Sequence, residues 1–194
     1  MDSVIKNLAT PLNGKNTNKQ TYFSKKMKSS QLMKLFEDGL KDMYWAEIAL
    51  TKAIPSMIEN STCTELIETL TYHLGETEGH VGRLEQVFEM LDEKAVAVRC
   101  EAMSGLIKEA SKIIEDCEVG AMRDAGIISA EQKIVHYKIA SYGSLRQFTE
   151  TLGLNDASAL LKNNLDEEIV TDEKLTDVAL SAVNIVASKL EFKN

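Results

Sequence analysis

Apolar residues recur every three or four positions along four long stretches of the chain. This spacing places them on one face of an α-helix, and helices of this kind bury their apolar faces against one another. The pattern therefore predicts an all-α fold, a four-helix bundle made of two helix hairpins. The predicted helices cover residues 29–59, 62–91, 127–152 and 155–190.

Shorter signals complete this prediction. Thr62–Glu65 has the sequence of a capping box, which is typical of a helix start. Gly153 stands where a helix C-terminus favours glycine. Between the hairpins, residues 101–118 predict an extra short amphipathic helix, which we expect to lie across the bundle or at a subunit contact. A segment ending at Gly126 is expected to link it to the third long helix.

Each apolar stripe is interrupted near its middle by ionisable residues. On the second helix the stripe passes through His73, then Glu76 or Thr77, then His80. The other three helices are interrupted at Glu47, at Lys138, and at Glu168 with Asp172. Because the interruptions fall at similar depths, these side chains are expected to meet inside the bundle.

A weak internal repeat supports two related hairpins. A shift of 91 residues pairs Glu47 with Lys138 and Glu76 with Glu167, and it superimposes several apolar positions. Such a repeat is typical of a bundle with pseudo-twofold symmetry. It also makes Glu167 an alternative to Glu168, which the apolar stripe favours.

Buried carboxylates need protons, a lysine or metal ions to neutralise them, since an unpaired buried charge costs several kcal/mol. Carboxylates together with imidazole suit iron or manganese. His73 is interpreted as a core histidine, and His80 as the imidazole ligand. The candidate metal ligands are therefore Glu47, Glu76, His80, Glu168 and Asp172.

Composition and charge narrow the class of protein. The hydrophobic content is 44 % and there are only two prolines, which suits one helical domain with a real core. The net charge is −8, although residues 1–28 carry six lysines and one aspartate. We expect a flexible basic tail over 1–28, with a basic arm touching a neighbouring subunit as the alternative, and a bundle domain over 29–194. An acidic body is a poor surface for nucleic acid or anionic membranes.

The three cysteines are expected to be reduced thiols, because they are odd in number and lack metal-site spacing. The N-terminus has no apolar stretch typical of a secretion signal, and no apolar run approaches the length of a membrane span. These features predict a cytoplasmic protein.

Several motifs resemble the YciE/YciF family of bacterial ferritin-like stress proteins, over about residues 29–189. They are YWAEIALTKAIP (44–55), HLGETEG (73–79), AMSGLIKEA (102–110), AEQKIVHYKIASYGSL (130–145) and LDEEIVTDEKLTDVA (165–179). The resemblance implies a ferritin-like bundle, a homodimer, a dinuclear metal site and a role in stress. Ferroxidase-like or other oxidoreductase chemistry at iron or manganese would follow from such a site.

One departure from that family bears directly on the site. Members usually read E-H-Y-E on the third helix, whereas this chain has Val135-His136-Tyr137-Lys138. A lysine ammonium takes the place of one cation and repels another. The site is therefore expected to hold one metal ion or none. The alternatives are a metal-free structural or interaction bundle in which Lys138 replaces the metal, and an acidic helical adaptor that binds a partner through residues 101–118.

Overall fold

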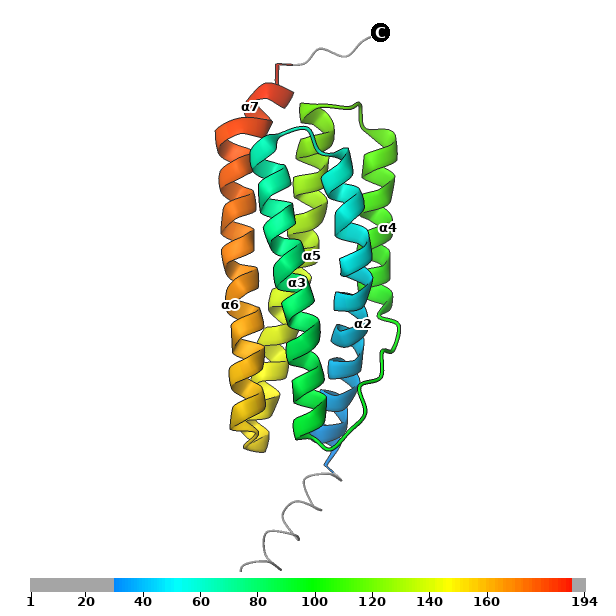
Figure 1. Ribbon diagram of the computed structural model, residues 1–194, viewed down its shortest axis with the longest axis vertical. Coiled ribbons are helices and arrows are strands. Elements are labelled where there is room, and N and C mark those ends of the chain that lie inside the picture. The colour runs from blue at the N-terminus through cyan, green and yellow to red at the C-terminus, as the bar shows by residue number, and fades with distance from the viewer. Residues whose placement is uncertain (1–29, 190–194) are drawn as a thin grey trace, which may run out of the picture.

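The computed structural model describes residues 30–189, which form a bundle of long antiparallel helices (Figure 1). The predicted all-α bundle of two hairpins with an extra helix between them is confirmed. The predicted tail over 1–28 lies outside the described residues. The long helices are α2 (Gln31–Asn60), α3 (Thr64–Met90), α5 (Ala121–Leu152) and α6 (Asn155–Val178), and α4 (Glu101–Asp116) follows α3.

Local sequence explains where α2 begins and where α5 ends. Ser30 caps α2, since its hydroxyl accepts a hydrogen bond of 3.0 Å from the Met33 amide. Gly153 ends α5 with φ of 72°, a left-handed conformation that favours glycine, as the sequence predicted. Pro55 does not end α2, which continues to Asn60.

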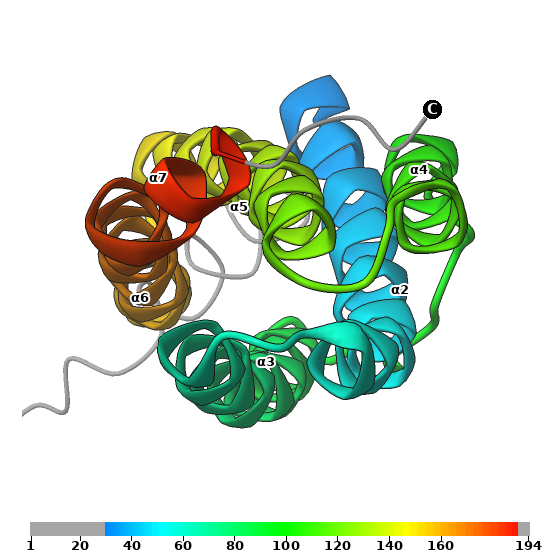
Figure 2. The same cartoon turned by 90° about the horizontal axis from the view of Figure 1, so that it is seen from above.

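Two expectations for the region around α4 need correction. Of the two placements expected for α4, the one across the bundle is wrong, since α4 runs alongside the bundle, packed against α2 and α5 (Figure 2); the placement at a subunit contact stays a prediction. α5 begins at Ala121 rather than near residue 127, so Gly126 is inside the helix. A Cβ atom at Gly126 would lie only 2.5 Å from the Ile113 side chain, so this glycine allows α4 and α5 to approach closely.

The last predicted helix is also divided. α6 ends at Val178 and is followed by a π-helical turn, Ala179–Val183, and by the short helix α7 (Asn184–Ala187). Within residues 30–189, none of the helices is both long enough and apolar enough to cross a membrane.

The buried apolar residues form two separate clusters along the bundle. One lies near the connection between α2 and α3 and includes Ile54, Leu66 and Leu175. The other cluster lies toward the opposite end of the bundle and includes Phe36 and Leu84. On α3, α5 and α6 the interruptions at His73–His80, Lys138 and Glu168 fall between the two clusters, and Glu47 lies next to their boundary on α2. The polar layer therefore has apolar material on both sides.

The start of α3 is held by Asp124 of α5 rather than by a capping box. Cys63 occupies the N-cap position and makes no side-chain capping hydrogen bond. The Asp124 carboxylate, 2 % exposed, accepts hydrogen bonds from the Thr62 amide (2.8 Å), the Thr62 hydroxyl (2.7 Å) and the Cys63 amide (3.0 Å). One buried residue therefore joins the first hairpin to the second.

Replacing Asp124 with alanine should destabilise the bundle, because it removes the buried acceptor of three hydrogen bonds that join the two hairpins. We expect a loss of about 2–4 kcal/mol in the free energy of unfolding, measured by urea denaturation. Asp177→Ala is the matched control, since that side chain is exposed on α6 and should change stability by about 0.5 kcal/mol or less. Equal stability of the two variants would show that the Asp124 contacts contribute little.

Candidate functional site

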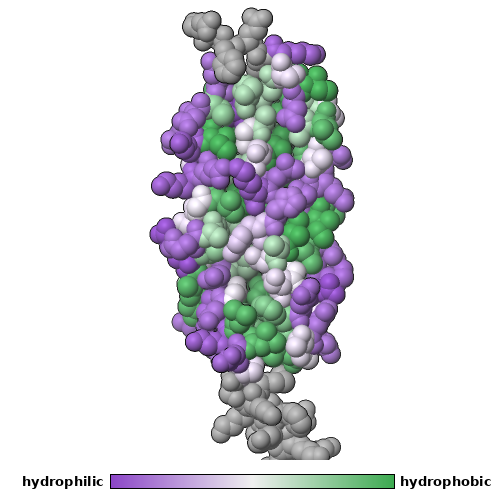
Figure 3. All heavy atoms as spheres, turned by 180° about the vertical axis from the view of Figure 1, so that it is seen from behind, coloured by the Kyte–Doolittle hydropathy of each residue, from purple (hydrophilic) through white to green (hydrophobic). Residues whose placement is uncertain are grey.

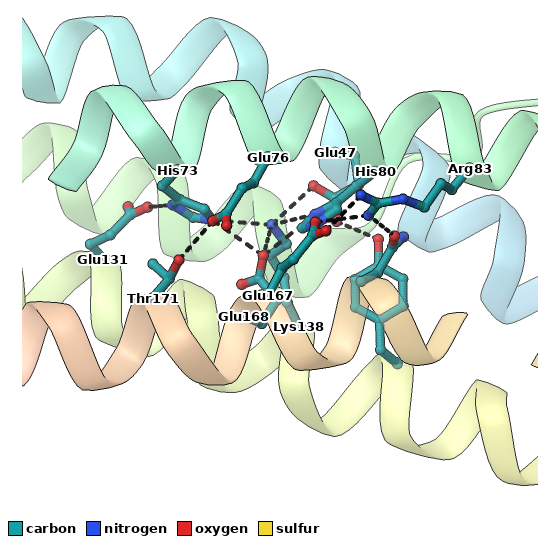
Figure 4. Close-up of polar contacts among 12 residues, drawn as sticks. Glu47, His73, Glu76, His80, Arg83, Glu131, Lys138, Glu167, Glu168 and Thr171 are labelled. Carbon is teal, nitrogen blue, oxygen red and sulfur yellow. Dashed lines mark hydrogen bonds and ion pairs between the residues drawn. The ribbon is translucent and has the colours of Figure 1, made fainter. Parts of the chain in front are cut away.

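The polar layer brings together side chains from all four long helices (Figure 4). Each of them is fully buried, with 0 % exposure. They are Glu47 of α2, His73 and His80 of α3, Glu131 and Lys138 of α5, and Glu168 of α6. Their positions follow from helical periodicity, because each continues the inward-facing stripe of its own helix.

Lys138 lies at the centre of this group. Its Nζ atom is 3.1 Å from Glu47 Oε2 and 2.5 Å from Glu168 Oε1. It also lies 3.3 Å from His73 Nε2 and 3.4 Å from His80 Nδ1. An ammonium group therefore occupies the point on which two carboxylates and two imidazoles converge.

The charges in this group stabilise one another. Burial alone would lower the pKa of Lys138, but the Glu168 and Glu47 carboxylates beside it raise that pKa above its ordinary value. Burial would raise the pKa of Glu47, yet the charges of Lys138 and His80 and the hydrogen bonds it accepts lower it to about 2. The pKa of Glu168 is lowered as well, against the effect of burial, by Lys138 and His73. Lys138 is thus an ammonium between two carboxylates.

His73 bridges two carboxylates on different helices. Its Nδ1 atom is 2.6 Å from Glu131 Oε1, and its Nε2 atom is 3.2 Å from Glu168 Oε1. Burial and the charge of Lys138 lower the pKa of His73, but Glu168 and the hydrogen bond to Glu131 outweigh them and raise it to about 9. His73 is therefore a second buried cation at neutral pH.

His80 connects the buried layer to the surface. Its Nε2 atom is 2.9 Å from Glu167 Oε2, while its Nδ1 atom lies beside Lys138. Glu167 also accepts a hydrogen bond of 2.6 Å from Arg83 and is 30 % exposed. Although partial burial would raise its pKa, the hydrogen bonds from His80 and Arg83 lower the pKa of Glu167 to about 2. A continuous polar path thus runs from the rim to Lys138.

Three of the five predicted ligand residues meet in this layer, namely Glu47, His80 and Glu168. Glu76 does not, since it is only half-buried and accepts a hydrogen bond of 2.9 Å from Thr171 at the side of the bundle. The inward position belongs to Thr77, the other residue that the stripe allowed. Successive side chains of a helix point about 100° apart, so when Thr77 faces inward Glu76 faces the side of the bundle.

Asp172 also lies away from the layer. Its Oδ1 atom is 3.2 Å from Nε2 of His136, a residue 63 % exposed on the flank of the bundle. Thr171, the neighbouring residue, takes the inward position on α6. Glu167 was the alternative to Glu168 as the inward-facing carboxylate of the last helix. Glu168 contacts Lys138, whereas Glu167 lies at the rim of the layer and contacts His80.

Sequence reasoning missed Glu131 and gave Tyr142 no part in the site. Glu131 lies seven residues before Lys138, two helical turns away on the same face, and this spacing could have identified it. Tyr142 is one turn after Lys138, and its hydroxyl donates a hydrogen bond of 2.5 Å to Glu47 Oε1. Burial and the negative charge of Glu47 raise the pKa of Tyr142, so it stays a neutral donor.

A dinuclear metal centre does not fit these side chains. Lys138 Nζ stands between the carboxylates that would bridge two ions, and its charge would repel both. Both ring nitrogens of His73 already face carboxylates. Among residues 30–189, no group of three or more histidine, cysteine or acidic side chains is arranged to hold a metal ion.

The titration of His73 predicts how stability changes above neutral pH. Because its pKa is about 9 in the fold and near 6.5 in the unfolded chain, its contribution is fully present below pH 6.5. That contribution is lost as the pH rises through about 9. We expect the free energy of unfolding to fall by about 3 kcal/mol between pH 6.5 and pH 9.5, measured by urea denaturation at several pH values.

His73→Gln should flatten this alkaline decline, whereas His136→Gln, which alters an exposed imidazole, should retain it. An undiminished decline in the His73 variant would contradict the assignment.

On the acid side, the lowered pKa of Glu47 contributes to the free energy of unfolding above pH 4.5, and this contribution is lost as the pH falls toward 2. The two limits place maximal stability between about pH 5 and 6.5.

Comparison with known proteins identifies relatives that span almost the whole bundle. The chain is 43 % identical over 157 residues to protein YciF of Escherichia coli, an alignment that covers 78 % of this chain and 95 % of YciF. The crystal structure of that E. coli stress protein matches with a TM-score of 0.76 at 42 % identity, covering 80 % of this chain and 98 % of YciF. YcfI of Rhodopseudomonas palustris, described as a proposed structural protein, matches with a TM-score of 0.74 at 41 % identity, covering 77 % and 96 %.

The fold extends to a more distant protein of Xanthomonas campestris, with a TM-score of 0.64 at 17 % identity, covering 83 % of this chain and 100 % of that one. The family model described as domain of unknown function DUF892 matches residues 31–188, which include every residue of the polar layer. The expected resemblance to YciF is thereby confirmed, and the chain belongs to the DUF892 family.

Proposed function

We propose that this protein is a stress-associated structural bundle in which the Lys138 ammonium neutralises the buried carboxylates in place of metal ions. The position of Lys138 Nζ, 3.1 Å from Glu47 and 2.5 Å from Glu168, is the observation that carries this proposal. The description of YciF as a stress protein and of YcfI as a proposed structural protein supports the same class of function.

The chemistry of the layer favours a structural role over a redox role. An ammonium has no accessible change of oxidation state, and it cannot polarise a bound oxygen species as a metal ion would. What it does supply is a fixed positive charge at the depth where α2 and α6 each bury a carboxylate. It therefore ties helices of both hairpins to α5 and keeps their surfaces in one arrangement for contact with partners, which we expect to include a second copy of the chain.

A residual iron or manganese site is the second candidate. One feature favours it, because Glu131 Oε2 and Glu168 Oε2 are buried and have no hydrogen-bond partner among residues 30–189. Open carboxylate oxygens of this kind are what a hard cation would use. Such an ion would have to enter while Lys138 moved away from Glu47 and Glu168 or lost its proton, and the raised pKa of Lys138 opposes the loss.

Metal content distinguishes the two candidates. After dialysis against iron or manganese and removal of free ions, we expect wild-type protein to retain less than about 0.1 ion per chain by elemental analysis, since the ammonium repels a cation. Lys138→Glu, which removes the positive charge and adds a carboxylate, should bind metal. Lys133→Glu, a charge change on the exposed face of α5, is the control and should not. Stoichiometric metal in the wild-type protein would overturn the proposal.

Stability provides an independent test of the role of Lys138. Lys138→Met should lower the free energy of unfolding by about 3–5 kcal/mol, because it leaves Glu47 and Glu168 buried without their shared cation. Adding Glu47→Gln and Glu168→Gln to that variant removes the uncompensated charges and should restore much of the loss. A single variant as stable as the wild type would show that the ammonium does not hold the layer together.

A further inference from the structure

A surface groove between α2 and α5 remains uncovered in one half of the bundle. α4 lies along the outside of α2 and α5 but spans only the half of the bundle that contains the α2–α3 connection (Figure 1). Beyond the start of α4, the groove has a volume of about 420 Å³. Its lining includes Leu35, Asp38, Asp42, Leu145 and Phe148. Seen from the opposite side, the bundle exposes apolar residues in this half (Figure 3).

The groove combines apolar surface with unpaired negative charge. Leu35, a large aliphatic side chain near the start of α2, is 55 % exposed. Asp38 and Asp42 lie one helical turn apart, and neither forms an ion pair with a residue in the range 30–189. Partial burial and the charge of Asp38 raise the pKa of Asp42, so the two carboxylates repel one another. A segment with both lysines and apolar side chains would complement such a surface.

We propose that residues 22–28 of the same chain bind in this groove. Their sequence, YFSKKMK, provides three lysines together with a tyrosine, a phenylalanine and a methionine. The lysines would pair with Asp38 and Asp42, and the apolar side chains would cover Leu35 and Phe148. The groove would then be closed along its whole length, by α4 in one half and by the segment in the other.

The geometry permits this contact within one molecule. Asp38 and Asp42 are eight and twelve residues beyond Ser30, which places them about 12 and 18 Å along α2 at 1.5 Å per residue. Seven extended residues span about 23 Å. Ser30 has an extended backbone, with φ of −78° and ψ of 146°, so the chain leaves the helix direction there. A reversal at residues 29–30 would therefore bring 22–28 alongside both aspartates.

The comparisons set this segment apart from the common fold. The family match begins at residue 31, directly after the N-cap of α2. Residues 1–28 carry a formal charge of +5, opposite in sign to the rest of the chain. Because the segment is basic and joins the bundle at the same end as the groove, its local concentration at Asp38 and Asp42 is far higher than that of any separate partner.

Chymotrypsin cleavage after Tyr22 and Phe23 in the full-length protein tests the proposal. The segment should be cleaved slowly in the wild-type protein, and D38K/D42K should speed cleavage about fivefold, because it replaces attraction with repulsion. K25D/K26D should have the same effect. Combining the four substitutions restores opposite charges and should restore protection. E115Q/E118Q, which alters exposed carboxylates at the other end of the bundle, is the control and should leave the cleavage rate unchanged.

The combined variant separates a direct contact from a general effect of charge. Failure of the four substitutions to restore protection would overturn the proposal, as would wild-type cleavage as fast as that of a free peptide of the same sequence. Protection that increases with protein concentration would assign the groove to the segment of a second copy and would also overturn it. Circular dichroism melts of each variant establish that the bundle itself remains folded during the assay.

Discussion

The contact of Lys138 with Glu47 and Glu168 is the constraint on which the centre of the bundle depends. These residues are fully buried between two apolar clusters, where water cannot stabilise their charges. Removing Lys138 would leave both carboxylates without the cation that they share. An ion pair of this kind adds little net stability over an apolar core of equal volume, but it strongly disfavours arrangements in which its members are separated. It therefore fixes how α2, α5 and α6 meet.

The internal repeat gives this contact a simple geometric meaning. Glu47 and Lys138 are equivalent positions under the 91-residue shift, and the structure places their side chains in direct contact. Two positions that are equivalent in the repeat thus meet at the centre of the bundle. With a glutamate at both positions, two carboxylates would be opposed there and would need cations between them. With a lysine at one position, the pair neutralises itself.

Periodicity predicted most of the fold and five of the six buried residues of the polar layer, all except Glu131. Four helices and their inward faces follow from apolar spacing, and Glu47, Lys138 and Glu168 were placed on the inward faces for the same reason. The choice between Glu76 and Thr77 failed because a one-residue step changes the direction of a side chain by about 100°, and spacing alone cannot decide between neighbours. Local sequence could not place α4 either, since its position depends on the contact that Gly126 permits with Ile113.

Glu131 shows that a sequence pattern does not reveal which buried residues contact one another. Glu131 lies inside the third predicted helix, 127–152, but a charged residue near a helix start does not stand out as part of an apolar stripe, although it belongs to the same face as Lys138. The bridge from Glu131 through His73 to Glu168 joins three helices, and no local sequence signal contains a contact between residues so far apart. Sequence patterns identify the faces of helices, whereas the partners of a buried charge depend on how those faces are assembled.

A built-in cation also changes what the folded state depends on. A site completed by metal ions is stabilised by mass action, so its contribution varies with the concentration of free metal. Lys138 is covalently part of the chain, and its charge is present whenever the chain folds. On the proposed function, a chain that carries this lysine keeps its bundle whatever the supply of metal. On the proposed function, the chain keeps this fold for the surfaces that it presents, since the Lys138 ammonium neutralises the carboxylates at the centre in place of metal ions.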